Sequence, residues 1–287
     1  MTSIQHDALQ RFTLEGSNVR GEIVHLDEAW QTILSRTEYP APVRRVLGEA
    51  LSAVALLSAT IKFDGSLILQ MTGDGPMSML VVQARPDRTL RGLARWRGEP
   101  QSAGLTDLVG TGRLVMTIDP GAGMERYQSI ISVTTDSLSE LLHVYFEQSE
   151  QLSTRLWLTA DETASAGMLL QRLPGDEEDD EPWRRAVMLA STVQEHELLE
   201  AASEMVLARL FAIDGVRIFE PESYQFHCTC SRETIEATLR IMPVSELYEI
   251  IEEQGKIAVD CEFCGAAYTW NEADVARIAP ADAANGS

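Results

Sequence analysis

Hydrophobic and polar residues alternate along several short stretches of the first 172 residues, and this period of two predicts β-strands. Residues 41–61 are apolar at helical spacing instead, which predicts a buried helix. A further helix is expected from Thr135 to Glu147. These elements favour one α/β domain, with a mixed or antiparallel sheet, over residues 1–172. The expected strands are residues 19–26, two strands in 65–84 around a turn at 73–76, 89–96, 112–119, 126–134 and 154–160.

The pattern changes after residue 172. Residues 174–183 (PGDEEDDEPW) combine turn formers with a run of acids, which repel one another and stay solvated. Residues 184–213 then have helical spacing with one apolar face, while acidic side chains three and four residues apart weaken the isolated helix. Because such a helix depends on docking, we expect a metastable helical linker over residues 173–226. Its apolar face includes Leu198, Met205, Val206 and Leu210.

Residues 227–287 form the third predicted part, a small unit that contains all the cysteines. Ser231 and Ser245 are candidate N-caps of its helices, and Gly255 is placed to end the second one. The expected elements are helices 231–242 and 245–254 and strands 256–260 and 267–270. The predicted fold class is therefore α+β: an N-terminal α/β domain, a helical linker and a small C-terminal four-cysteine domain.

Composition limits the partners of this chain. It has 287 residues and a formal net charge of −21, so its surface repels phosphate groups, and we expect neither nucleic acid nor a membrane as partner. The most apolar stretch, residues 50–61, is shorter than the about 20 residues that span a bilayer. The N-terminus lacks the basic and apolar regions of a secretory signal. We expect a cytoplasmic protein in a reducing compartment, where permanent disulfides are rare.

The four cysteines lie in two tight pairs, in the segments HCTCSRE and DCEFCGAAY. Four thiolates match a closed structural zinc site, whose sulfurs lie about 2.3 Å from the metal. The two-residue gap in CEFCG lets both sulfurs turn inward, and an extended backbone in CTC puts both on one side. His227 would point away from this site. We predict one Zn²⁺ per chain, held by Cys228, Cys230, Cys261 and Cys264.

Zinc is expected to be essential to the C-terminal unit, because about 60 residues bury too little surface to be more than marginally stable. The same sulfurs are also open to oxidation, through a sulfenic acid that a neighbouring thiol converts to a disulfide. The spacing allows closure within each pair, which would eject the metal. From the residues alone, a static zinc site and a redox-active one both remain open.

Other catalytic signals are absent from the sequence. It contains no GxxxxGK[ST] motif for ATP, and neither GxSxG nor HExxH. The segment GTGRLV, residues 110–115, lacks the third glycine of a dinucleotide-binding motif. CEFC is followed by a glycine and a strand-like segment, whereas a thioredoxin-type active site opens a helix. We expect a binding protein and not an enzyme.

The order CTC, thirty residues and CEFCG, at the end of a chain of this length, resembles the heat-shock protein 33 family, the redox-regulated holdase chaperones of bacteria. The resemblance covers nearly the whole chain. It includes VRGEIV, YPAPVRRVLGE, LLSATIKFDGSLILQ, GDGPM, ERYQSII, YFEQSEQLSTRLWL, GMLLQ and FHCTCSRE.

The resemblance implies a protein that is zinc-bound and inactive when reduced. Oxidants with mild unfolding would release the zinc, form the disulfides Cys228–Cys230 and Cys261–Cys264, and destabilise the neighbouring linker. The exposed surface would bind unfolding client proteins without ATP and keep them from aggregating, and the active form would be a homodimer. The candidate client-binding residues are Leu198, Met205, Val206 and Leu210.

Two alternatives belong to other classes. A static zinc-ribbon interaction module would need a basic patch to bind nucleic acid, and residues 228–264 carry only Arg232, Arg240 and Lys256 as cations. A thiol oxidoreductase would need an exposed CEFC that is catalytic without zinc. The resemblance favours the holdase.

Overall fold

The computed structural model describes residues 6–60, 65–102, 104–121, 124–150, 152–174 and 180–278. The chain is divided into two units, a first unit from Met1 to His227 and a second from Cys228 to Ser287, which we call the cysteine unit. Both units contain helices and strands, which confirms the α+β class. Within the described ranges, none of the helices combines the length and the apolar composition that crossing a bilayer requires.

Six strands form an antiparallel sheet, sheet A, in the order β10-β1-β2-β9-β8, with β11 also pairing with β1. Four of them, β1, β9, β10 and β11, are missing from the strands expected from sequence. Since β9 is buried on both faces, its apolar residues do not alternate with polar ones and give no period of two. The strands are β1 (Ala8–Leu14), β2 (Val19–Leu26), β8 (Thr154–Ala160), β9 (Ser165–Arg172), β10 (Val216–Ile218) and β11 (Glu222–Ser223).

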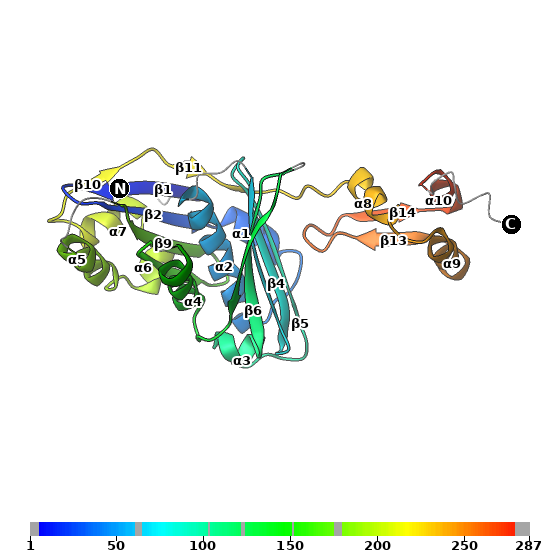
Figure 1. Ribbon diagram of the computed structural model, residues 1–287, viewed down its shortest axis with the longest axis horizontal. Coiled ribbons are helices and arrows are strands. Elements are labelled where there is room, and N and C mark those ends of the chain that lie inside the picture. The colour runs from blue at the N-terminus through cyan, green and yellow to red at the C-terminus, as the bar shows by residue number, and fades with distance from the viewer. Residues whose placement is uncertain are drawn as a thin grey trace. The chain divides into compact units, whose positions relative to one another are not determined.

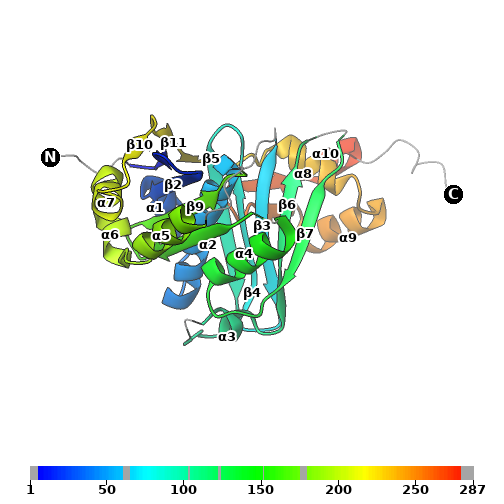
Figure 2. The ribbon, with the colours of Figure 1, turned by 60° about the vertical axis from the view of Figure 1, so that its left-hand side comes forward.

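Sheet B also has six strands, in the order β12-β5-β4-β3-β6-β7, and Figure 2 shows β3, β6 and β7 side by side. Its pairs are antiparallel except that β12 runs parallel to β5. The expected turn joins β3 to β4. Glycine is required there, because a Cβ on Gly75 would lie 2.6 Å from the Leu108 carbonyl oxygen. The strands are β3 (Ser66–Gly73), β4 (Met77–Ala84), β5 (Thr89–Trp96), β6 (Gly112–Asp119), β7 (Tyr127–Ser132) and β12 (Gln225–Phe226).

The helix expected over residues 41–61 is α2 (Ala41–Thr60), and it lies between the two sheets (Figure 1). Its buried side chains join Leu9 of sheet A and Leu69 of sheet B in the main hydrophobic core. Residue 61 lies outside the described residues. The second expected helix begins later than predicted, where the Ser137 side chain accepts a hydrogen bond from the Glu140 amide. The remaining helical segments of this part are α1 (Glu28–Leu34), α3 (Leu105–Val109), α4 (Leu138–Tyr145) and a π-helical turn (Phe146–Glu150).

Three helices cover the other face of sheet A: α5 (Glu181–Ala190), α6 (Glu195–Glu200) and α7 (Ser203–Leu210), as Figures 1 and 2 show. The prediction of one helix over 184–213 is therefore wrong. The chain turns after α5, and Gln194 starts a new helix through a reciprocal capping pair with Glu197. These helices and the sheet share a set of buried side chains, which we call the linker cluster. It comprises Phe12, Leu14, Val19, Ile23, Ala166, Met168, Leu170, Ala186, Ala190, Leu198, Val206, Leu207, Leu210 and Phe211.

The cysteine unit has its own small core. It holds α8 (Arg232–Leu239), α9 (Val244–Gln254), β13 (Ile257–Asp260), β14 (Ala267–Trp270) and α10 (Glu272–Ile278). Ser231 caps α8 as predicted, with its hydroxyl accepting from the Thr234 amide at 3.1 Å. The prediction for Ser245 is wrong, because Pro243, which lacks an amide hydrogen, directly precedes the first helical residue, Val244. The core side chains are Leu239, Leu247, Ile257, Trp270, Val275 and Ile278.

The sequence predicts three parts, residues 1–172, 173–226 and 227–287, and the structure has two units. The helices between residues 181 and 210 pack within the first unit, and so do β10, β11 and β12. The metastability of the linker stays a prediction.

Candidate metal centre

The first cysteine pair lies in the extended segment that leads into α8, and the second lies in the turn between β13 and β14. In that turn the amides of Cys264 and Gly265 donate to the Cys261 carbonyl at 3.3 and 2.7 Å. Gly265 has a φ of +71°, a left-handed conformation that glycine adopts without a Cβ penalty. The hairpin therefore folds the backbone back over the two sulfurs, as expected for CEFCG.

The structure brings the four sulfurs together although the pairs are far apart in sequence. All four Sγ atoms lie within 4.8 Å of one another. The Sγ atoms of Cys228 and Cys261 are 3.6 Å apart, and those of Cys230 and Cys264 are 3.3 Å apart. Four sulfurs about 2.3 Å from one metal in a tetrahedron are separated by about 3.8 Å. The spacing is compatible with a metal ion.

Electrostatics at the cluster favour a cation. Burial is the main cause that raises the pKa of the Cys264 thiol to about 12, and hydrogen bonds with the other three thiols add to it. The Cys264 thiol therefore resists ionisation, because its thiolate would be desolvated beside three further sulfurs. A divalent cation reverses this preference, since it stabilises thiolates directly.

One aromatic residue that the sequence did not single out contacts the cluster. The Tyr268 hydroxyl lies 3.3 Å from the Cys230 Sγ and 3.3 Å from the Cys230 carbonyl oxygen. The hydrogen bond to Cys230 is the main cause that raises the pKa of this phenol to about 12. Behind it, Tyr268 stacks on Trp270, with ring centroids 6.3 Å apart. The sequence signal for Tyr268 was its position four residues after Cys264, where the second strand of the hairpin brings the chain back past the sulfurs.

Histidines do not join this cluster. His227 belongs to the first unit, and its amide donates to the Leu90 carbonyl at 3.0 Å. The His143 Nδ1 lies 2.9 Å from the Thr154 carbonyl oxygen, and the His25 Nε2 lies 2.9 Å from that of Leu199. In the part of the chain that the structure describes, the four cysteines are the only group of three or more His, Cys, Asp or Glu with ligand atoms this close.

The predicted apolar face of the linker divides into buried and exposed residues. Leu198, Val206 and Leu210 are buried in the linker cluster against sheet A. Met205 is 58% exposed, so its assignment to the same face is wrong. The break between α6 and α7 changes the rotation of the helix, and the spacing counted along one continuous helix does not survive it.

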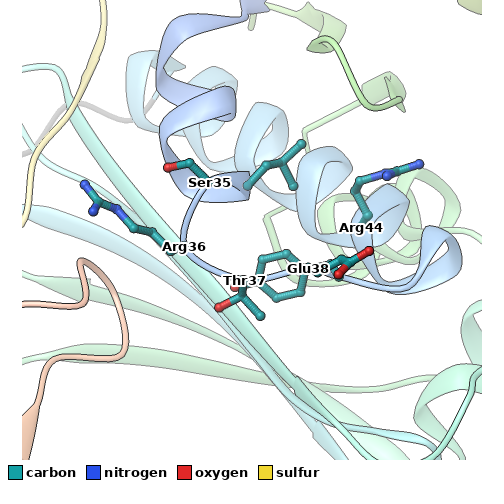
Figure 3. A pocket seen from close by; sticks show the side chains of 7 residues that line it. Ser35, Arg36, Thr37, Glu38 and Arg44 are labelled. Carbon is teal, nitrogen blue, oxygen red and sulfur yellow. The ribbon is translucent and has the colours of Figure 1, made fainter.

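A pocket of about 300 Å³ lies outside this region, at the end of α1 (Figure 3). It is lined by residues 34–39 and Arg44, and Arg36 and Arg44 point to opposite sides of it. The Ser35 hydroxyl donates to the Thr32 carbonyl at 2.8 Å, and Arg44 pairs with Glu162 at 3.4 Å. The Ser35 hydroxyl and the Arg44 guanidinium are therefore already engaged with groups outside the pocket lining.

Comparison with known proteins is consistent across the chain. The sequence profile described as Hsp33 protein matches residues 7–271. A protein named 33 kDa chaperonin from Nitrosococcus oceani is 47% identical over 272 residues, which are 95% of this chain and 94% of that protein. The 33 kDa chaperonin of an Enterobacter species is 42% identical over 287 residues, 97% of this chain and 98% of that one.

A solved structure shares the fold. The crystal structure of the 33 kDa chaperonin (heat shock protein 33 homolog) from Thermotoga maritima superposes with a TM-score of 0.83. It is 22% identical in sequence, and the match covers 95% of this chain and 98% of that one. With the profile and the close relatives, this leads to one conclusion: the chain belongs to the Hsp33 family.

Proposed function

We propose that this protein is a redox-regulated, ATP-independent chaperone, a holdase that binds unfolding proteins and prevents their aggregation. The observation that carries the proposal is the meeting of all four cysteines of the chain at one cluster of metal-binding size. The names of its relatives, 33 kDa chaperonin, support a chaperone. The proposal contains no catalytic step, and it places the protein in a reducing compartment, the cytoplasm.

In the reduced state we assign the four cysteines as ligands of one Zn²⁺. The ion would supply the positive charge that keeps the four sulfurs ionised together. Tyr268 would then donate its hydroxyl hydrogen to the Cys230 sulfur, which holds that sulfur in place. Among the described residues of this unit, six buried side chains form the core, so its fold would depend on the ligand set.

Oxidation would convert each cysteine pair to a disulfide. A thiolate attacks hydrogen peroxide, takes one oxygen atom to become a sulfenic acid, and the second thiol of the pair then forms the S–S bond. Each disulfide consumes one peroxide and releases two water molecules. The proposed bonds are Cys228–Cys230 and Cys261–Cys264.

The proposed disulfide pairs differ from the closest sulfur contacts of the folded unit. In the folded unit the Cys228 sulfur lies 3.6 Å from that of Cys261, and the Cys230 sulfur lies 3.3 Å from that of Cys264. Forming the proposed disulfides therefore exchanges contacts across the two segments for bonds within each. Because those contacts hold the segments together, this exchange favours opening of the cysteine unit. We propose that oxidation and unfolding reinforce each other in this way.

Opening would then reach the linker, residues 173–226, and release Leu198, Val206 and Leu210 from sheet A. These apolar side chains and the sheet face beneath them would become surface for clients. Met205, already exposed, would contribute little to the change. We also propose that the active form is a homodimer.

The test follows zinc and aggregation together. Reduced, zinc-loaded protein is treated with peroxide at a mild heat-stress temperature without nucleotide, free zinc is followed with a colorimetric chelator, and client aggregation by light scattering. Zinc release with falling scattering, both reversed by thiol reductant plus zinc, is the expected result. Zinc that stays bound, or that leaves without client protection, would make the cysteine unit a static zinc module.

A further inference from the structure

The segment that joins α7 to the first cysteine runs along the edges of both sheets. We call residues 214–227 the strap. In Figure 1 its strands β10 and β11 run beside β1, which would be the edge strand of sheet A without them. Its last strand, β12, pairs with β5 at the edge of sheet B. The strap thus covers strand edges that would otherwise have unpaired backbone groups.

The backbone amide and carbonyl groups of β1 point alternately toward the strap and toward β2. Odd-numbered positions face the strap: the Asp7 carbonyl accepts from Tyr224 at 2.6 Å, the Arg11 carbonyl accepts from Phe219 at 2.9 Å, and the Glu15 amide donates to Gly215 at 3.0 Å. Leu9 and Thr13, between them, lie opposite Glu222 and Arg217. Since neighbouring residues in a strand direct their backbone groups to opposite sides, the even-numbered positions face β2.

Side chains of the strap pack at the edges of both sheets, with Phe226 on β12 beside β5. Tyr224 is buried, with its hydroxyl 3.2 Å from the Ser58 Oγ and 3.3 Å from the Ala55 carbonyl oxygen. Phe226, two residues on, packs against the main hydrophobic core. Glu222 pairs with both Arg11 and Arg88. The strap therefore presents large aromatic side chains at alternate positions, preceded by an acid.

The strap is held mainly at Glu222, Tyr224 and Phe226, while its strands are short and part of it is exposed. Its three strands are three, two and two residues long. Ile218 and Phe219 within it are 36% and 42% exposed. Its last residue, His227, directly precedes Cys228, so the strap is the part of the first unit that the chain joins to the cysteine unit. A strap so anchored is among the first segments expected to leave.

We infer that the outer edge of β1, once the strap has left, is a binding site for extended segments of unfolding client proteins. Such a segment adds as a further strand of sheet A and directs large apolar side chains to the positions that the strap fills. The strap then acts as an internal stand-in for a client. This inference rests on the proposed function and names the part of the chain that clients contact.

An unfolded client is the occupant that fits this edge. Unfolded chains offer extended backbone with unpaired donors and acceptors, which is what the odd-numbered positions of β1 lack after the strap leaves. A second copy of this chain offers the same kind of edge, and the hydrogen-exchange experiment below distinguishes it from a client.

Residue-resolved amide hydrogen exchange tests the inference, with the control built into the same strand. The amides of Leu9 and Thr13 face the strap, and those of Gln10 and Phe12 face β2. In the full-length protein activated by peroxide, Leu9 and Thr13 are expected to exchange fast while Gln10 and Phe12 stay protected. Adding a chemically unfolded client should slow exchange at Leu9 and Thr13 by at least about tenfold.

A peptide with the sequence of residues 214–227 provides a second measurement. It should protect Leu9 and Thr13 in the activated protein and displace bound client. The matched peptide with Tyr224→Ser and Phe226→Ser keeps the length and charge, and should do neither.

Each contrary outcome has its own meaning. Client protection from aggregation without slower exchange at Leu9 and Thr13 overturns the site and leaves the proposed function intact. Protected Leu9 and Thr13 in activated protein without client means that the strap or a second copy occupies the edge, which also overturns the site. Failure to protect the client at all overturns the proposed function, and the site with it.

Discussion

Leu207 offers a direct test of whether docking of the linker helices controls the exposure of apolar surface. Its side chain is fully buried in the linker cluster, whereas Met205, two residues earlier on α7, is 58% exposed. Replacing a buried Leu by Ala destabilises by about 2–5 kcal/mol. At about 1.4 kcal/mol for each factor of ten, this raises the undocked fraction of α7 about 30-fold to a few thousand-fold.

The assay uses reduced, zinc-loaded protein without oxidant. In Leu207→Ala, the amides of α7 should exchange at least about 30 times faster than in the wild type, and a chemically unfolded client should be protected from aggregation while zinc stays bound. Met205→Ala removes an apolar side chain of similar size from the same helix and should behave as the wild type. Unchanged protection of α2 shows that the first unit remains folded.

Two results would refute this reasoning. Equal α7 exchange in Leu207→Ala and Met205→Ala would mean that burial of Leu207 does not hold the helix on sheet A. Faster α7 exchange without any client protection would mean that the surface under α7 is not the one that clients bind.

Three further predictions concern the metal, the cluster and pH. Chelation of the metal, or Cys261→Ser, should unfold the cysteine unit, because structural zinc contributes about 10–16 kcal/mol in small finger peptides; Trp270 is fully buried, so its emission should shift to the red, and an unshifted emission would contradict the prediction. Tyr268→Phe removes the hydroxyl 3.3 Å from the Cys230 sulfur and should speed peroxide-driven zinc release up to about tenfold. Tyr248→Phe, at a partly exposed site of the same unit, is its control, and equal rates in the two variants would count against the contact. Burial raises the pKa of Glu22 to about 7 from its ordinary value of 4.5, so the folded state holds a proton there that the unfolded chain has lost. The contribution of Glu22 to stability therefore falls as pH rises between these values, by up to about 3 kcal/mol, and stays lost above them. Glu22→Gln should flatten urea-unfolding stability between pH 5 and 8, and an unchanged slope would exclude Glu22 as its source.

Strands whose two faces meet different surroundings were predictable from the sequence. β3, β4, β5 and β6 match their expected bounds closely. Along each of these strands, residues that pack on the core around α2 alternate with residues on the opposite face of the sheet. β9 was missed because both of its faces are buried. β10, β11 and β12 are too short to show any period, and only pairing with β1 and β5 makes them strands.

Within the linker, the sequence correctly predicted helical structure, but the prediction of one continuous helix was wrong. Apolar spacing identified Leu198, Val206 and Leu210 as buried, but counting along a single helix also included Met205. The break between α6 and α7, after Leu198, changes the rotation by which later residues face sheet A. Where helices break depends on hydrogen bonds to side chains and on the surface beneath them, which a helical period does not contain.

The amino-acid sequence by itself determined the elements of the cysteine cluster. Two short Cys spacings, with Gly265 after the second, specify how each pair presents its sulfurs, because only a few backbone torsions lie between them. Tertiary structure alone decided which sulfurs are neighbours, with Cys228 beside Cys261 and Cys230 beside Cys264. It also decided that Tyr268 reaches Cys230 and that the strap covers β1. These contacts join residues at least 33 positions apart, so they depend on how the hydrophobic cores pack and not on local chain geometry.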